Sequence, residues 1–148
     1  CSLTGITAAP HAAVPHVRNV RIVNNTVVNH PTGVRVRWAG AERMIFANNA
    51  IYCPGQSAID AAGVEAHTFS ANYVSGGLTG TSIDGKHFHD GGTMAQTFIG
   101  PQEVDYYPDD GSILIGAADS QFAPPLDLLG KVRKVPFDVG AYERQEER

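Results

Sequence analysis

The sequence predicts an all-β chain of stacked parallel strands, a β-solenoid, and three observations favour it. β-branched stretches such as Val20–Val23 and Val34–Val36 are typical of strands. The chain also carries 16 glycines and 9 prolines, which supply many turns. Two sequence markers recur about every two dozen residues, a period too short for helix-pair repeats and suited to one coil of a solenoid.

The first marker is an asparagine corner inside the segments VRIVNNTVVN, MIFANNAIYC and HTFSANYVSG, which superpose when Asn25, Asn49 and Asn72 are aligned. We expect these three asparagines to form a structural amide ladder, because asparagine suits such corners. The alignment also predicts two inward columns of apolar side chains: Ile22, Phe46 and Phe69, and Val27, Ile51 and Val74.

The second marker is a short strand that follows each corner, in the segments 4–6, 32–34, 57–59 and 81–83. Together the markers predict about four coils over residues 1–90, with neighbouring strands about 4.8 Å apart. Residues 91–110 are expected to leave the coils as an irregular loop, and Tyr106–Pro108 to cover the core. Residues 91–143 then form the closing segment of the same domain, and 144–148 a solvated tail.

At this point the chain resembles a known family. NVRIVNNTVVN and MIFANNAIYC resemble coils of right-handed parallel β-helix proteins, the pectate-lyase-like superfold. A Gly-Ser turn, an Asp-x-x-Gly-x-x-Arg stretch at 127–133 and Asp-Val-Gly-Ala-Tyr-Glu at 138–143 are similar to the closing segment of that family. The chain departs from the pattern at Leu114–Gly116, where a carboxylate is missing. The resemblance implies a right-handed solenoid that is extracellular or in the cell envelope, and many relatives act on or bind acidic polysaccharides.

The register places Cys1 at the end of a strand position, partway round a coil. We therefore expect the chain to be the C-terminal portion of a longer β-helix, whose N-terminal portion, or a neighbouring chain, stacks on the Cys1 end. A lipidated N-terminal cysteine and an N-terminal nucleophile are the alternatives. Cys1 and Cys53 fall too far apart for a disulfide, and Cys53 is expected to pack as a small apolar residue.

One outer face of the coils is the predicted binding surface. If the second marker keeps its register, this face gathers the candidate substrate-binding residues Arg35, Arg37, Trp38, Lys86 and His87. An indole stacks on sugar rings, and charged groups orient hydroxyls or carboxylates. This composition predicts a polysaccharide site.

Asp60 and Asp84 are the candidate catalytic residues. On adjacent coils their carboxyl groups would lie about 5 Å apart, near the separation that retaining glycosidases use. The same pair would suit Ca²⁺. In the alternative interpretation Asp60 pairs with Arg35, and Asp84 points to solvent or caps a turn.

A second constellation is the stretch His87–Asp90. His87 and His89 alternate to one face of a strand, a spacing compatible with Zn²⁺, and Asp90 or His67 would be a third ligand. Such His-x-His pieces are frequent by chance, so these residues are weak metal candidates and no cofactor is assigned.

Two functions remain open: an extracellular β-helix that binds polysaccharide on its outer face, with cleavage as an additional option, and a non-catalytic structural or adhesive solenoid of a cell surface or filament. A formal net charge of −4 argues against a nucleic-acid partner. No stretch approaches 18 apolar residues, so no membrane span is expected.

Overall fold

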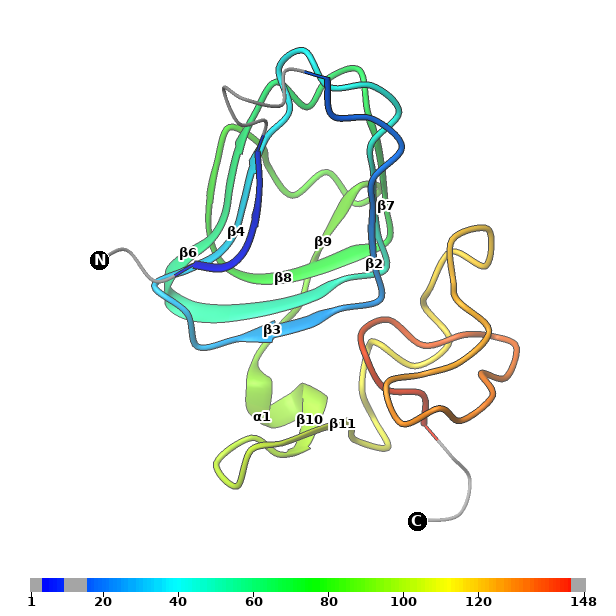
Figure 1. Ribbon diagram of the computed structural model, residues 1–148. Coiled ribbons are helices and arrows are strands. Elements are labelled where there is room, and N and C mark those ends of the chain that lie inside the picture. Colours follow the sequence, from blue (N-terminus) through cyan, green and yellow to red (C-terminus); the bar gives the residue numbers. More distant parts are fainter. Residues whose placement is uncertain (1–3, 10–15, 145–148) are drawn as a thin grey trace.

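The computed structural model describes residues 4–9 and 16–144. This part of the chain is mostly β-structure with one short helix (Figure 1). The elements are β1 (Thr4–Ala8), β2 (Arg21–Val23), β3 (Thr26–Val28), β4 (Thr32–Arg37), β5 (Ile45–Ala47), β6 (Ala50–Ala62), β7 (Thr68–Ser70), β8 (Asn72–Thr79), β9 (Phe88–Asp90), α1 (Met94–Thr97), β10 (Phe98–Gly100) and β11 (Asp105–Pro108).

Two parallel sheets carry the fold, which confirms the all-β expectation with parallel strands. A six-stranded sheet has the order β1-β4-β6-β8-β9, with β3 also paired to β6, and a three-stranded sheet has the order β2-β5-β7. In Figure 1 the two sheets form facing walls, β4 and β6 on one side and β2 and β7 on the other, while β3 and β8 run between them. In the two parallel sheets most paired residues lie 23 to 28 positions apart in the chain, in agreement with the repeat, whereas β8 and β9 pair only 16 positions apart.

The inward columns are confirmed by the strand register. Phe46 pairs with Ile22 on one side and Phe69 on the other, and Ile51 pairs with Val27 and Val74 in the same way. Phe46 and Ile51 are buried. Because like side chains stack directly on one another, the core runs continuously through the coils.

The asparagine ladder is also confirmed. The Asn49 Oδ1 atom accepts from the backbone N–H and the side-chain amide of Asn25, both at 3.0 Å. Asn72 Oδ1 does the same for Asn49, at 3.1 and 2.9 Å. The ladder therefore ties each corner to the next coil with two hydrogen bonds, and these side chains are structural.

A glycine is required where the second marker begins. A Cβ atom built on Gly33 would lie 2.7 Å from the carbonyl oxygen of Ala58 and 2.9 Å from Cys53 Sγ. The Thr-Gly pairs at 4–5 and 32–33 thus reflect the close approach of neighbouring strands at this corner. Cys53 itself is buried and free, in agreement with its expected packing, and burial raises the pKa of its thiol.

The prediction that residues 81–83 form the fourth strand of the second marker is wrong. Thr32 pairs with Ser57 as expected, but the next strand offers Gly77 and Leu78 to Ser57 and Ile59, not residues 81–83. The reason is the length of the corner: five steps along β6, from Tyr52 to Ser57, lie opposite only two steps along β8, from Ser75 to Gly77, so a constant step overshoots the partner. Residues 81–83 lie beyond β8, and Ile83 is exposed.

The segment after β9 is more regular than expected. Residues 91–110 contain α1 and an antiparallel pair, β10 with β11. The Tyr107 ring is buried and stacks on Tyr142, with centroids 4.6 Å apart, so this stretch covers the core as predicted. At the C-terminal end, Arg144 donates its backbone N–H to Asp138. The rest of the predicted tail lies outside the described residues.

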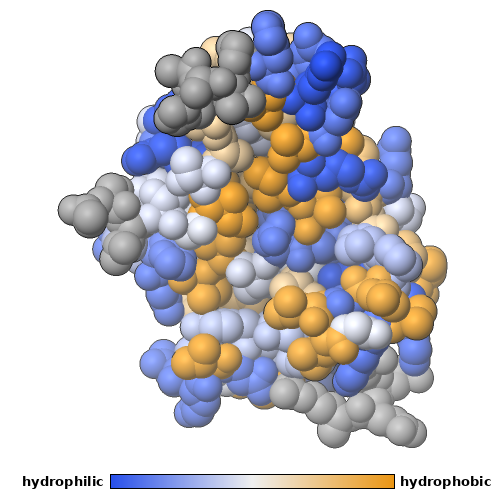
Figure 2. All heavy atoms as spheres, viewed as in Figure 1, coloured by the Kyte–Doolittle hydropathy of each residue, from blue (hydrophilic) through white to orange (hydrophobic). Residues whose placement is uncertain are grey.

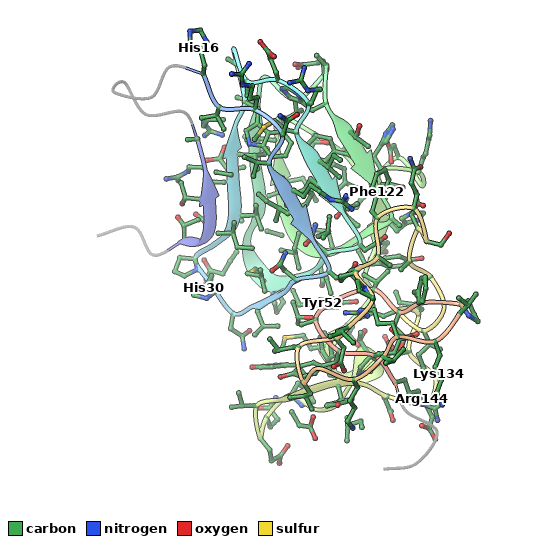
Figure 3. The ribbon with its side chains drawn as sticks, turned by 45° about the vertical axis from the view of Figure 1, so that its right-hand side comes forward. His16, His30, Tyr52, Phe122, Lys134 and Arg144 are labelled. Atoms are coloured by element: carbon green, nitrogen blue, oxygen red, sulfur yellow. The ribbon has the colours of Figure 1, made fainter. Side chains whose placement is uncertain are left out.

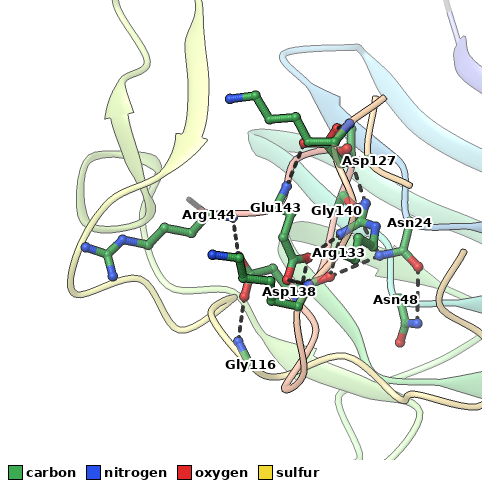
Figure 4. A network of polar contacts seen from close by, with 12 residues as sticks. Asn24, Asn48, Gly116, Asp127, Arg133, Asp138, Gly140, Glu143 and Arg144 are labelled. Carbon is green, nitrogen blue, oxygen red and sulfur yellow. Dashed lines mark hydrogen bonds and ion pairs between the residues drawn. The ribbon is translucent and has the colours of Figure 1, made fainter. Parts of the chain in front are cut away.

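Within the predicted closing segment, 91–143, the residues from 109 onward lie beside the coils (Figures 1 and 3). The residues that carry the family resemblance, in 127–133 and 138–143, form a buried polar network (Figure 4). Arg133 and Glu143 form an ion pair of 2.8 Å whose side chains are 1% and 2% exposed. Arg133 also donates to the carbonyl oxygens of Asp138 and Gly140, at 3.2 and 2.8 Å.

Among the helices of the described residues, none is long and apolar enough to cross a bilayer.

Candidate functional site

The outer face of β4 and β6 carries a compact ion cluster of Arg35, Arg37 and Asp60. Asp60 accepts from Arg35 Nε at 2.9 Å and from Arg37 Nη2 at 2.6 Å to each carboxylate oxygen. Hydrogen bonds from Arg37 and then Arg35 hold the pKa of Asp60 below its usual range. This confirms the alternative in which Asp60 pairs with Arg35, and the two guanidinium groups are engaged by the protein itself.

Asp60 and Asp84 do not form a pair. Asp60 faces Thr79 on the neighbouring strand, whereas Asp84 belongs to the turn before β9. The cause is the corner of β8, which is shorter than the corner of β6 opposite it. Asp84 therefore lies five positions past Thr79, the partner of Asp60. The predicted acid/base pair, and the Ca²⁺ site that shared it, are therefore corrected.

Asp84 caps its own turn, as the alternative interpretation expected. Its Oδ1 atom accepts the backbone N–H groups of Lys86, His87 and Phe88 at 2.7 to 3.0 Å. Its Oδ2 atom lies 2.5 Å from His87 Nδ1. Although desolvation acts to raise it, the hydrogen bonds from Phe88, Lys86 and His87 hold the pKa of Asp84 well below its usual range.

Trp38 is a second correction. Its side chain is 1% exposed, and its ring lies 5.3 Å from that of Phe69 and 6.4 Å from that of Phe46. The alternation along β4 explains this: Arg35 and Arg37 point outward, so the residue that follows them points inward. An inward indole cannot stack on a sugar at the outer face.

Lys86 and His87 also fall outside the predicted face. Arg37 has Ala62 as its partner on the next strand, while Lys86 and His87 lie in the turn that Asp84 caps. His87 borders a small pocket of about 170 Å³. The pocket is lined by Val64, Glu65, His67, Phe69, Thr81, Asp84, His87 and Phe88.

The weak metal candidates have separate partners. His87 contacts Asp84, whereas the His89 ring stacks on Tyr73 with centroids 4.8 Å apart and an interplanar angle of 14°. Asp90 accepts the backbone N–H of Gly92 at 2.9 Å. Over residues 4–9 and 16–144, no group of three or more His, Cys, Asp and Glu side chains is placed to hold a metal ion.

A pocket of about 490 Å³ lies between the coil corners and the segment that follows β9. It is lined by Asn29, Pro54, Ser75, Thr93, Met94, Ala95, Pro101 and Gln102. The described lining residues are neutral, and they combine amide and hydroxyl groups with apolar surface. Sequence reasoning missed this pocket because its residues come from five separate stretches of the chain that share no motif.

Two more residues with a defined task escaped the sequence reasoning. Asn24 and Asn48 precede the ladder asparagines and have positive φ angles of 52° and 57°. Asn24 donates to the carbonyl oxygens of Asp138 and Gly140 (Figure 4). Asn48 exchanges hydrogen bonds with the backbone of Asp119. They attach the closing segment to the coils. The doubled Asn-Asn in two successive repeats was the signal that could have identified them.

Cys1 lies outside the described residues, so none of its three interpretations meets a structural observation. No family model, curated protein or solved structure matches this chain.

Proposed function

We propose that the chain is part of a right-handed parallel β-helix that is extracellular or in the cell envelope and binds a neutral polysaccharide without cleaving it. The successive parallel pairing of strands, most of it between residues 23 to 28 positions apart, supports the solenoid. Crossovers between parallel strands are almost always right-handed, which supports its hand.

The observation that carries the binding proposal is the neutral pocket of about 490 Å³. Sugar hydroxyl groups both donate and accept hydrogen bonds, and so do the amide and hydroxyl groups of Asn29, Ser75, Thr93 and Gln102. Pro54, Met94 and Pro101 add apolar surface for the C–H faces of a sugar ring. Because the described lining carries no charge, it matches a neutral glycan better than an acidic one.

The carboxylates favour binding over cleavage. A glycosidase acid needs a carboxyl group whose pKa is raised, so that it carries a proton near neutral pH. The pKa values of Asp60 and Asp84 are both lowered, and each carboxylate is occupied by internal hydrogen bonds. Neither side chain suits the role of a general acid.

Calorimetric titration with soluble neutral polysaccharides (a xylan, a mannan and a mixed-linkage glucan), each compared with polygalacturonate, tests the proposal. We expect binding to a neutral polymer, and Gln102→Ala to weaken it about tenfold because a buried sugar hydroxyl loses its partner. Gln121→Ala is the matched control, since Gln121 is exposed on the closing segment and away from the pocket. Absence of binding to every neutral polymer, or equal affinity in Gln102→Ala, contradicts the proposal.

A structural or adhesive solenoid of a cell surface or filament is the second candidate. It is favoured by the exposed apolar end of the coil stack at β1 and β2, which forms a hollow of about 330 Å³. An isolated binding protein would leave this apolar surface exposed to water, whereas a module inside a longer stack would bury it against its neighbour.

A further inference from the structure

We infer that the end of the coil stack at β1 and β2 docks one further coil of parallel β-strands that carries an asparagine opposite Asn25. This inference stands apart from glycan binding, and it gives the structural candidate a defined partner.

The end face is apolar. The hollow there is lined by Ile6, Thr7, Ala8, Ala9, Val17, Val20, Ile22, Trp38 and Met44. Figure 2, which views the molecule as in Figure 1, shows hydrophobic residues gathered between the strand walls. Ile6 and Ile22 are only partly buried, whereas their partners one coil further in, Val34 and Phe46, are 0% and 1% exposed. One more coil would bury the outer pair as deeply as the inner pair.

The backbone at this end of the stack also has a free hydrogen-bonding edge. In the described residues, β1 and β2 each stand at the end of their sheet, with a partner on one side only. One coil further in, Val20 and Asn25 accept from the N–H groups of Ile45 and Ala50, at 2.9 and 2.8 Å. A parallel strand on the free side would continue this ladder, while an open edge leaves it unpaired.

Asn25 identifies the chemistry of the missing partner. Asn49 Oδ1 and Asn72 Oδ1 each accept two hydrogen bonds, from the backbone N–H and the amide of the asparagine one coil earlier. Among the described residues, Asn25 Oδ1 accepts none, although its amide group donates to Val23 and Asn49. Its free acceptor therefore faces the position where an asparagine of a preceding coil would donate twice.

The same atom argues against a second copy of this chain as the occupant. Two copies related by a two-fold axis would pair β1 with β1 in antiparallel fashion, and would place one Asn25 acceptor against the other. A parallel coil supplies donors to that acceptor and aliphatic side chains to Ile6 and Ile22. The occupant is accordingly a coil of the same repeat.

The test adds such a coil from the protein's own sequence. Thr4 pairs with Thr32, which lies 28 positions later in the chain. In a copy of residues 17–28 fused directly before Cys1, each copied residue also precedes its original by 28 positions. The copied Ile22, Asn25 and Val27 therefore face the original residues. Hydrogen exchange measured by NMR on the fused protein should show amides of β1 and β2 protected about tenfold more than in the native chain. The thermal midpoint should rise as well.

Two controls make the result decisive. A fusion with the same twelve residues in scrambled order should give no protection, and a fusion whose copied Asn25 is replaced by leucine should lose protection at the Asn25 corner. Equal protection from the ordered and scrambled extensions overturns the inference. So does a native dimer, detected by light scattering, that Ile22→Lys abolishes, because the occupant is then a second copy. Glycan affinity is measured separately, so failure of the glycan proposal leaves these outcomes unchanged.

Discussion

In the coils, like side chains lie on like side chains, whereas residues 109–144 have no repeat and are held by directional bonds between unlike groups. Phe46 contacts Phe69 and Phe88, with ring centroids 5.6 and 6.5 Å apart. In the closing segment a single guanidinium, that of Arg133, bonds to Glu143 and to several carbonyl oxygens. The stacked core tolerates conservative exchange of one apolar side chain, while the network depends on each of its members.

The network depends on burial as well as geometry. Glu143 accepts the backbone N–H groups of Lys134 and Asp138, at 3.1 Å each, besides its bond to Arg133. Desolvation raises the pKa of Glu143, and the hydrogen bonds from Asp138, Lys134 and Arg133 act in the opposite direction. A buried carboxylate that lost its arginine would keep the desolvation cost without the compensating charge.

Of the substitutions proposed, Arg133→Met should therefore lower the free energy of unfolding most. We expect a loss of about 4 kcal/mol in the free energy of unfolding, because Glu143 remains buried without its counter-charge. Urea unfolding followed by circular dichroism measures it. Arg144→Met is the matched control: Arg144 contacts Asp110 at the surface, with side chains 38% and 86% exposed, and should lose less than about 1 kcal/mol. Similar losses in the two variants would contradict the special role of the buried pair.

Asn48→Gly should weaken the attachment of the closing segment to the coils without straining the backbone. Glycine accepts the positive φ of this position, so the variant removes only the amide bonds to Asn24 and Asp119. We expect a loss of about 2 kcal/mol and faster hydrogen exchange over residues 109–144. Ala71→Gly is the control, because Ala71 has a φ of 50° at the same place one coil later and no side-chain amide. Faster exchange in the coils instead would show that Asn48 serves the core.

Asp60→Asn should have the smallest effect, and a pH dependence with a definite sign. The lowered pKa of Asp60 means that its pairing with Arg35 and Arg37 stabilises the fold fully above about pH 4, the unfolded value, and that this contribution is lost as the pH falls through the folded value. Because both arginines are more than a third exposed, we expect about 1 kcal/mol at pH 7. Thermal melts of both proteins from pH 2 to 7 should converge at the acidic end; a constant difference would contradict the assignment.

The sequence predicted the repeating coils better than the rest of the chain, because a periodic pattern can be aligned with itself. The columns through Phe46 and Ile51 and the ladder through Asn49 follow from a repeat that can be aligned with itself. The position of Asp84 did not follow, because β8 has a shorter corner than β6 opposite it, and this shifts every residue that comes after. Trp38 was predictable from the alternation along β4, since the two arginines before it point outward.

The candidate site was the least predictable part. The neutral pocket joins Asn29, Ser75 and Gln102 from segments without a shared pattern, and the attachment of Asn24 to Gly140 spans 116 residues. Contacts of this range depend on how the closing segment lies against the coils, which no local spacing encodes.

By itself, the sequence determined the parallel strands, the inward columns, the asparagine ladder and the burial of Cys53, because each repeats or alternates with the geometry of a strand. Only the tertiary structure decided the partner of Asp60, the turn that Asp84 caps and the free acceptor of Asn25. These depend on turn lengths and on the neighbour across each strand, and in a stacked fold one residue gained or lost in a turn reassigns every neighbour that follows.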